Sequence, residues 1–183
     1  MSTAEQEILI IQLLDDALDS FEIIAKRLAS KEANCHRDHL FLALRQLGYF
    51  FVSKKSPLKS QKNLLSSEEE DIVNRIKDIR DAIAHKDLEI NFFNSYLKIV
   101  GSQIFKNRDV EIQFGKTKIY LLGEVLHVYK RFRFLFSVAP ELPRLAMHPK
   151  WRCDEQRLLQ VESKLKRKLV NPYYYIFKKR LKS

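Results

Sequence analysis

The chain has 183 residues and a formal net charge of +10, from 33 Lys and Arg against 23 Asp and Glu. This length suits a domain with a real hydrophobic core, and 45% hydrophobic with 31% charged residues is a globular composition. Only 4 Gly and 5 Pro argue against an all-β sandwich, and no apolar run approaches the roughly 20 residues of a membrane span. Two cysteines are too few for a disulfide scaffold. We therefore expect a cytoplasmic, mostly helical protein with no membrane contact.

The charge is distributed unevenly along the chain. Residues 1–24 carry six acids and no base, whereas residues 150–183 carry eleven bases and three acids. A basic excess favours a polyanionic partner, because each neutralised phosphate releases counterions. The same excess is compatible with a solvated basic face, or with a basic end that pairs with the acidic one.

The N-terminal part predicts two amphipathic helices. From Glu5 to Ala29 and again from Arg37 to Val52, apolar residues recur every three or four positions, which places them on one face of a helix. The segment 53–66 contains Pro57, four lysines and several polar residues, and it predicts a loop.

A third helix is expected to begin at Ser67. Ser67 and Glu70 have the spacing of a capping box, and four isoleucines from Ile72 to Ile83 lie on one face of the helix. After a break near residues 87–91, the apolar residues between 92 and 100 predict a further helix, which Gly101 would end.

The segment 110–121 carries the clearest β pattern. Val110, Ile112 and Phe114 alternate with polar residues, and residues 115–116 suit a two-residue turn. Pairing Phe114 with Thr117 sets Ile112 opposite Ile119 and Val110 opposite Leu121, so the apolar partners share one face. We predict a short hairpin that packs on the helices, since two strands alone are marginally stable.

The remaining sequence predicts two more helices, over residues 124–138 and 154–170, with three prolines between them. The fold class is thus an all-α bundle of five to six helices with a small inserted hairpin. We expect residues 1–140 to form the helical domain and residues 141–183 to form a basic helical extension packed on or near it.

The segment 79–85 contains the most informative polar cluster. On a helix, Asp81 and His85 are four residues apart, so the carboxylate can orient the imidazole and raise its pKa. Arg80 lies on the flank of the same face. Such a face could contact a phosphate or a second copy of the same helix.

These residues resemble the signature of the HEPN superfamily, in which an Arg, a polar residue, three further residues and a His lie late in an amphipathic helix. The match is Arg80, Asp81 and His85, with two long helices before the motif. The family consists of all-α domains, many of which are metal-independent endoribonucleases of toxin–antitoxin or antiviral defence systems. The resemblance therefore implies a homodimer through the motif helix, an antitoxin partner and no cofactor.

It also implies a mechanism for these residues. RNA carries its own nucleophile in the 2′-hydroxyl, so the reaction needs no metal. His85 would act as general base or acid, Arg80 would hold the scissile phosphate, and Asp81 would orient both side chains. The alternatives are a non-catalytic dimerisation module, in which the three residues only form salt bridges, and a plain RNA-binding protein.

Two basic segments are candidate RNA-binding sites. Lys130, Arg131 and Arg133 alternate with aromatic residues, as in single-strand binders, but a helix with a buried aromatic side and a basic outer side explains them better. The C-terminal segment could stack on RNA or dock on the domain, and its candidates are Tyr174, Lys178, Lys179 and Arg180. The spacing of Cys35, His36 and His39 matches no common zinc pattern, so no metal site is expected.

Overall fold

The computed structural model describes residues 3–27, 36–52, 64–83, 88–100, 103–114 and 116–170. This part of the chain is predominantly helical, which confirms the expected fold class. Its five α-helices are α1 (Thr3–Arg27), α2 (His36–Val52), α3 (Ser67–Ile83), α4 (Leu126–Ser137) and α5 (Pro149–Val170). The strands β1 (Leu88–Val100), β2 (Gln103–Phe114) and β3 (Thr117–Tyr120) form an antiparallel sheet in that order.

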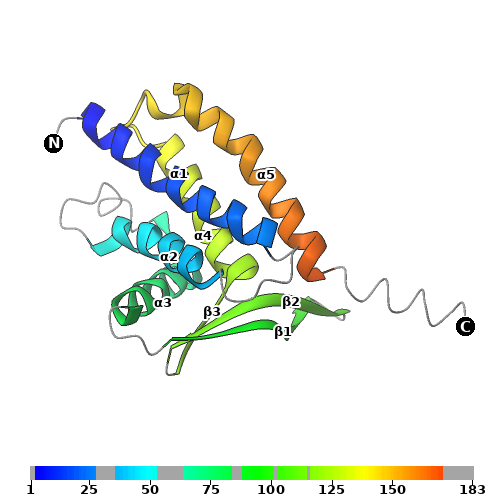
Figure 1. Cartoon of the computed structure of the whole chain (residues 1–183). Coiled ribbons are helices and arrows are strands. Elements are labelled where there is room, and N and C mark those ends of the chain that lie inside the picture. Colours follow the sequence, from blue (N-terminus) through cyan, green and yellow to red (C-terminus); the bar gives the residue numbers. More distant parts are fainter. Residues whose placement is uncertain are drawn as a thin grey trace, which may run out of the picture.

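The helices surround a single apolar core, and the sheet lies at one end of the bundle (Figure 1). α1 packs against both α2 and α5, and α2 packs in turn against α3. The aromatic centre of the core is Phe21 of α1, whose ring meets that of Tyr129 of α4 edge to face at 5.6 Å. The Tyr129 hydroxyl donates to the Leu14 carbonyl at 3.1 Å, which satisfies its one polar group.

The predicted hairpin is confirmed in register. Phe114 pairs with Thr117 and Ile112 with Ile119, and both isoleucines are fully buried. The prediction that Val110 would pair with Leu121 is wrong, because β3 ends at Tyr120. Leu121 instead begins a π-helical turn, Leu121–Val125, that continues into α4.

A buried carboxylate explains why the strand ends there. Asp109 accepts hydrogen bonds from the backbone nitrogen of Leu122 at 2.8 and 3.0 Å and from that of Gly123 at 2.8 Å. These amides belong to the first turn of a helical segment, where they lack helical acceptors. Asp109 therefore caps the turn that redirects the chain from the sheet into α4.

The expectation of a helix over residues 92–100 is wrong, because this segment belongs to β1. β1 pairs with β2 along its length, from Leu88 opposite Phe114 to Val100 opposite Gln103. The apolar residues Ile90, Phe92, Tyr96 and Val100 fit alternation as well as helical spacing. Pairing with the adjacent β2 decided between the two patterns, which local periodicity could not do.

α3 begins at Ser67 as expected, but its capping residues differ from prediction, and α5 begins earlier than expected. The capping box of α3 lies one residue earlier than expected: the Ser66 hydroxyl accepts from the Glu69 nitrogen at 3.2 Å, and the Glu69 carboxylate accepts from the Ser66 nitrogen at 2.8 Å. α5 begins at Pro149 rather than at Asp154. Proline suits the first helical position, because the amide hydrogen that it lacks would have no helical acceptor there.

Candidate functional site

Arg80 lies in the last turn of α3, three residues before the helix ends at Ile83. Its Nε donates to the Asp81 Oδ1 atom at 2.9 Å, and its Nη2 contacts the same oxygen. The Arg80 side chain is 21% exposed, whereas the Asp81 side chain is largely in solvent. Asp81 thus holds the guanidinium at the surface of the helix while part of it stays accessible.

Gly48 of α2 lets the Arg80 side chain cross the α2–α3 contact. A Cβ atom at Gly48 would lie 2.8 Å from Arg80 Cδ, closer than such atoms approach one another. The path of Arg80 across α2 therefore requires a residue without a side chain. Sequence reasoning missed Gly48, although an isolated glycine within a helical pattern is a signal of close packing.

His85 lies outside the described residues, so its predicted pairing with Asp81 stays a prediction. Among the described residues Asp81 pairs with Arg80. Of the three predicted residues, the structure thus describes Arg80 and Asp81, which form an ion pair at the end of α3.

Two basic residues of α4 form ion pairs with neighbouring helices. Lys130 pairs with Glu162 of α5 at 3.0 Å. Arg131 pairs with Glu69 of α3 at 3.2 Å through Nε and donates through Nη2 to the Leu64 carbonyl at 2.7 Å. Burial alone would raise the pKa of the Glu69 carboxyl, but the hydrogen bond from the Ser66 nitrogen and the nearby Arg131 guanidinium and His127 side chain hold this pKa below its ordinary value. These contacts join α4 to α3 and α5.

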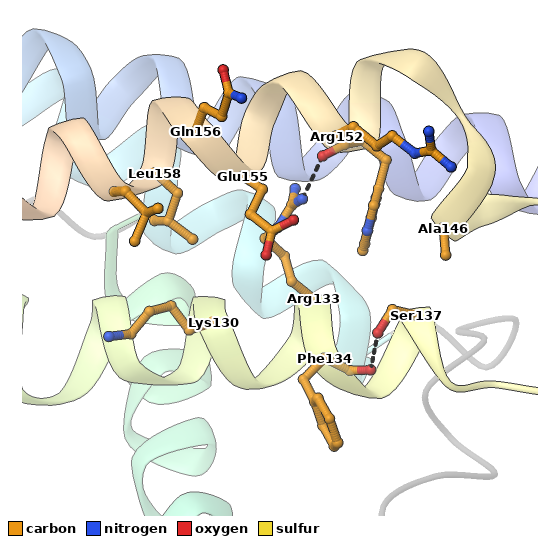
Figure 2. Close-up of a pocket in the computed structure, with 11 residues that line it drawn as sticks. Lys130, Arg133, Phe134, Ser137, Ala146, Arg152, Glu155, Gln156 and Leu158 are labelled. Atoms are coloured by element: carbon orange, nitrogen blue, oxygen red, sulfur yellow. Dashed lines mark hydrogen bonds between the residues drawn. The ribbon is translucent and has the colours of Figure 1, made fainter.

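Arg133 is buried, with 6% of its surface exposed. Its Nη2 donates to the Trp151 carbonyl of α5 at 2.6 Å, and its guanidinium carbon lies 4.1 Å from the centre of the Trp151 ring (Figure 2). Such stacking is a cation–π contact. Arg133 thus serves the α4–α5 contact. The expectation of a basic outer side and a buried aromatic side is wrong at two neighbouring positions, because Arg133 is buried whereas Phe134 is 54% exposed.

A second ion network ties α3 to the sheet. Arg75 forms a two-pronged pair with Glu124, at 2.7 and 2.9 Å, and donates to the Lys118 carbonyl at 2.6 Å. The Glu124 carboxylate also accepts from the Tyr120 nitrogen at 2.9 Å. The hydrogen bonds to Glu124 raise the pKa of Arg75 above its ordinary value despite some burial. This network fixes the hairpin against the helix that carries Arg80.

The other predicted residues bear on the site less directly. The tail candidates Tyr174, Lys178, Lys179 and Arg180 lie outside the described residues. Within the described ranges no three His, Cys, Asp or Glu side chains are grouped as a metal site would need, and Cys153 is an exposed free thiol. None of the described helices is long and apolar enough to cross a membrane.

Comparison with known proteins adds no relative to this geometry. The chain matches no family model, no curated protein and no solved structure at a significant level. A function must therefore be argued from the residues themselves.

Proposed function

We propose that the protein is a metal-independent endoribonuclease that resembles the HEPN superfamily, with Arg80, Asp81 and His85 as its catalytic residues. The observation that carries this proposal is the placement of Arg80. Its guanidinium is held by Asp81, its Cδ atom passes Gly48 of α2, and the side chain stays partly exposed at the end of α3. An arginine fixed in this way has lost much of its side-chain entropy, so it can bind a phosphate at low further cost.

The reaction is an internal attack on the RNA backbone. The 2′-hydroxyl loses its proton to a base and its oxygen bonds to the adjacent phosphorus, while the bond to the departing 5′-oxygen breaks and that oxygen takes up a proton. The products are a 2′,3′-cyclic phosphate and a 5′-hydroxyl end. His85 exchanges the protons near neutral pH, and Arg80 offsets charge on the phosphate oxygens.

A homodimer belongs to this proposal. One copy supplies one histidine, whereas the reaction needs a base and an acid at the same time. Two copies of α3 related by a two-fold axis would bring both histidines and both arginines to one phosphate. A toxin or antiviral role, with an antitoxin protein as partner, is the biological setting that the same resemblance suggests.

The test is cleavage of diverse RNAs in EDTA by purified wild type and by single variants. We expect His85→Ala to lower the cleavage rate by about two orders of magnitude or more, the usual contribution of general acid–base catalysis. His127→Ala is the matched control, because His127 is a half-exposed histidine on α4 that bonds only Glu69 among the described residues. It should cleave as wild type does.

Gly48→Ala tests the positioning of Arg80 without touching the motif. The new methyl group would force Arg80 Cδ to move, while alanine favours the helix by up to about 1 kcal/mol. We expect a folded protein of near-normal stability whose cleavage rate is reduced. The ribonuclease proposal is contradicted if folded, antitoxin-free wild type leaves RNA intact. It is also contradicted if substrates that lack the 2′-hydroxyl are cleaved to leave a 3′-phosphate.

A non-catalytic interaction module is the second candidate, and the Arg80–Asp81 ion pair favours it. A guanidinium already engaged by a carboxylate has less capacity for a phosphate. This candidate predicts that Asp81→Asn weakens self-association, measured by sedimentation. It also predicts that neither the wild type nor any variant of Arg80, Asp81 or His85 cleaves RNA.

A further inference from the structure

A pocket of about 740 Å³ opens between α4 and α5, built from residues that the proposed ribonuclease chemistry does not use. In Figure 2, Arg133 of α4 and Glu155 and Leu158 of α5 are directed into the space between the two helices, whereas Phe134 and Gln156 point away from it. The apolar part of its lining is contributed by both helices and the segment that joins them: Phe134, Ala146, Trp151, Leu158 and Leu159. Leu159 is 64% exposed, so a large apolar side chain faces solvent at the rim.

The charged part of the lining is mostly cationic. Lys130, Arg133 and Arg152 face a single carboxylate, that of Glu155. Glu162 neutralises Lys130 from outside the pocket. Within the described part of the chain, Arg152 and Glu155 have no ion-pair partner. The pocket therefore keeps one positive charge in excess.

Arg133 is the most unusual of these cations, because it is buried and has no carboxylate partner among the described residues. The buried Asp154 of α5 pairs with Lys150 and Arg157 instead. The Nη1 atom of Arg133 also lacks a hydrogen-bond acceptor within the described ranges. A buried charge without a counter-charge is costly, so an anion placed in the pocket would stabilise the α4–α5 contact.

We propose that this pocket binds a small organic anion with an apolar body. The apolar body lies against Trp151, Leu158 and Leu159, and the anionic group lies on the side of Arg133 and Arg152. A carboxylate and a phosphate monoester share this chemistry. Two probes of similar shape, phenylacetate and phenyl phosphate, distinguish a carboxylate ligand from a phosphate monoester.

Trp151 provides the measurement. It is the only tryptophan in the chain and it lines the pocket, so its fluorescence reports occupancy directly. We expect phenylacetate or phenyl phosphate to change the emission in a saturable way with a millimolar Kd, as suits so small a ligand. The neutral isostere phenylacetamide should have little effect, and so should acetate and inorganic phosphate, which lack the apolar body.

Three variants locate the binding. Arg152→Gln should raise the Kd of the anion that binds by about tenfold, the usual contribution of a hydrogen bond to a charged group. Glu155→Gln should lower this Kd several-fold, because the substitution removes a carboxylate that competes with the anion for the cations. Arg167→Gln is the matched control, since Arg167 is an exposed arginine on the same helix outside the pocket lining, and it should bind as wild type does.

The proposal is overturned if neither aromatic anion changes the emission of folded protein, or if phenylacetamide binds as well as they do. It is also overturned if Arg167→Gln weakens binding as much as Arg152→Gln, which would indicate a general surface charge. These titrations contain no RNA and use residues remote in sequence from the motif, so their outcome is independent of the ribonuclease proposal.

Discussion

At the scale of single residues, Arg157 connects the two ends of the chain. It is a half-buried residue of α5 whose guanidinium contacts four carboxylates, three on α1 and one on its own helix: Asp15, Asp19, Glu22 and Asp154. Lys150 adds a pair with Asp15 at 2.9 Å. The uneven charge of the sequence thus has a structural use, because part of the basic end pairs with the acidic helix, one of the alternatives that the sequence left open.

We predict that Arg157→Gln lowers the free energy of unfolding by about 2–3 kcal/mol at neutral pH, because it removes the cation that contacts all four of these carboxylates. Urea denaturation measures the change. Lys166→Gln is the control: Lys166 forms a single exposed pair with Glu162, so its loss should cost about 0.5 kcal/mol or less. Equal losses in the two variants would contradict a special role for Arg157.

The cost of Arg157→Gln should depend on pH. Hydrogen bonds from Lys26 and then Arg157 hold the pKa of Glu22 below its ordinary 4.5. A carboxyl whose pKa is lower in the folded state stabilises the protein above its unfolded pKa, and this stabilisation is lost as pH falls through the folded pKa. Burial raises the pKa of Asp154, so that carboxyl acts in the opposite sense. Because Arg157 helps to lower the pKa of Glu22, the difference in free energy of unfolding between wild type and Arg157→Gln should narrow below pH 4.5.

At the scale of elements, the start of α3 shows how the sequence offered two equivalent answers. Ser66 and Glu69, like Ser67 and Glu70, have the spacing of a capping box. The structure uses Ser66 and Glu69. Glu69 also receives Arg131 and His127 from α4, which gives the earlier frame a tertiary partner that local spacing does not reveal.

This assignment gives a matched pair of variants. Ser66→Ala should lower the free energy of unfolding by about 1 kcal/mol, since it removes the acceptor for the first-turn amide of Glu69. Ser67→Ala should change it by no more than a few tenths of a kcal/mol, because alanine is a good helix former at an exposed first position. Thermal or urea unfolding distinguishes them, and the reverse order would restore the later capping box.

At the scale of the whole molecule, the net charge of +10 divides into parts with different roles. Lys150 and Arg157 are committed to α1, and Lys130, Arg131 and Arg75 to contacts among α3, α4, α5 and the sheet. The cations at the C-terminal end remain candidates for a polyanion. We therefore predict that RNA contacts outside the proposed catalytic residues involve the tail rather than α4.

Removal of residues 171–183 tests that placement. It deletes Lys178, Lys179, Arg180 and Lys182 and no acid, so the net charge falls from +10 to +6. If the tail holds RNA, the truncated protein should bind more weakly, and its salt dependence should be shallower by up to about 3 counterions. Filter binding across a salt series measures both quantities. An unchanged slope would assign RNA contact elsewhere, and His85→Ala should leave the slope unaltered.

The sequence by itself determined those elements whose apolar pattern is compatible with only one kind of secondary structure. The long apolar faces of α1, α2 and α4 and the register of β2 with β3 were predictable, because periodicity and side-chain size settle them locally. Tertiary structure decided what local pattern left degenerate: the strand at residues 92–100, the choice of Ser66 over Ser67, and the burial of Arg133 against Trp151. Each depends on a partner distant in sequence, and the free energy of such a contact exceeds the small local preference that it overrides.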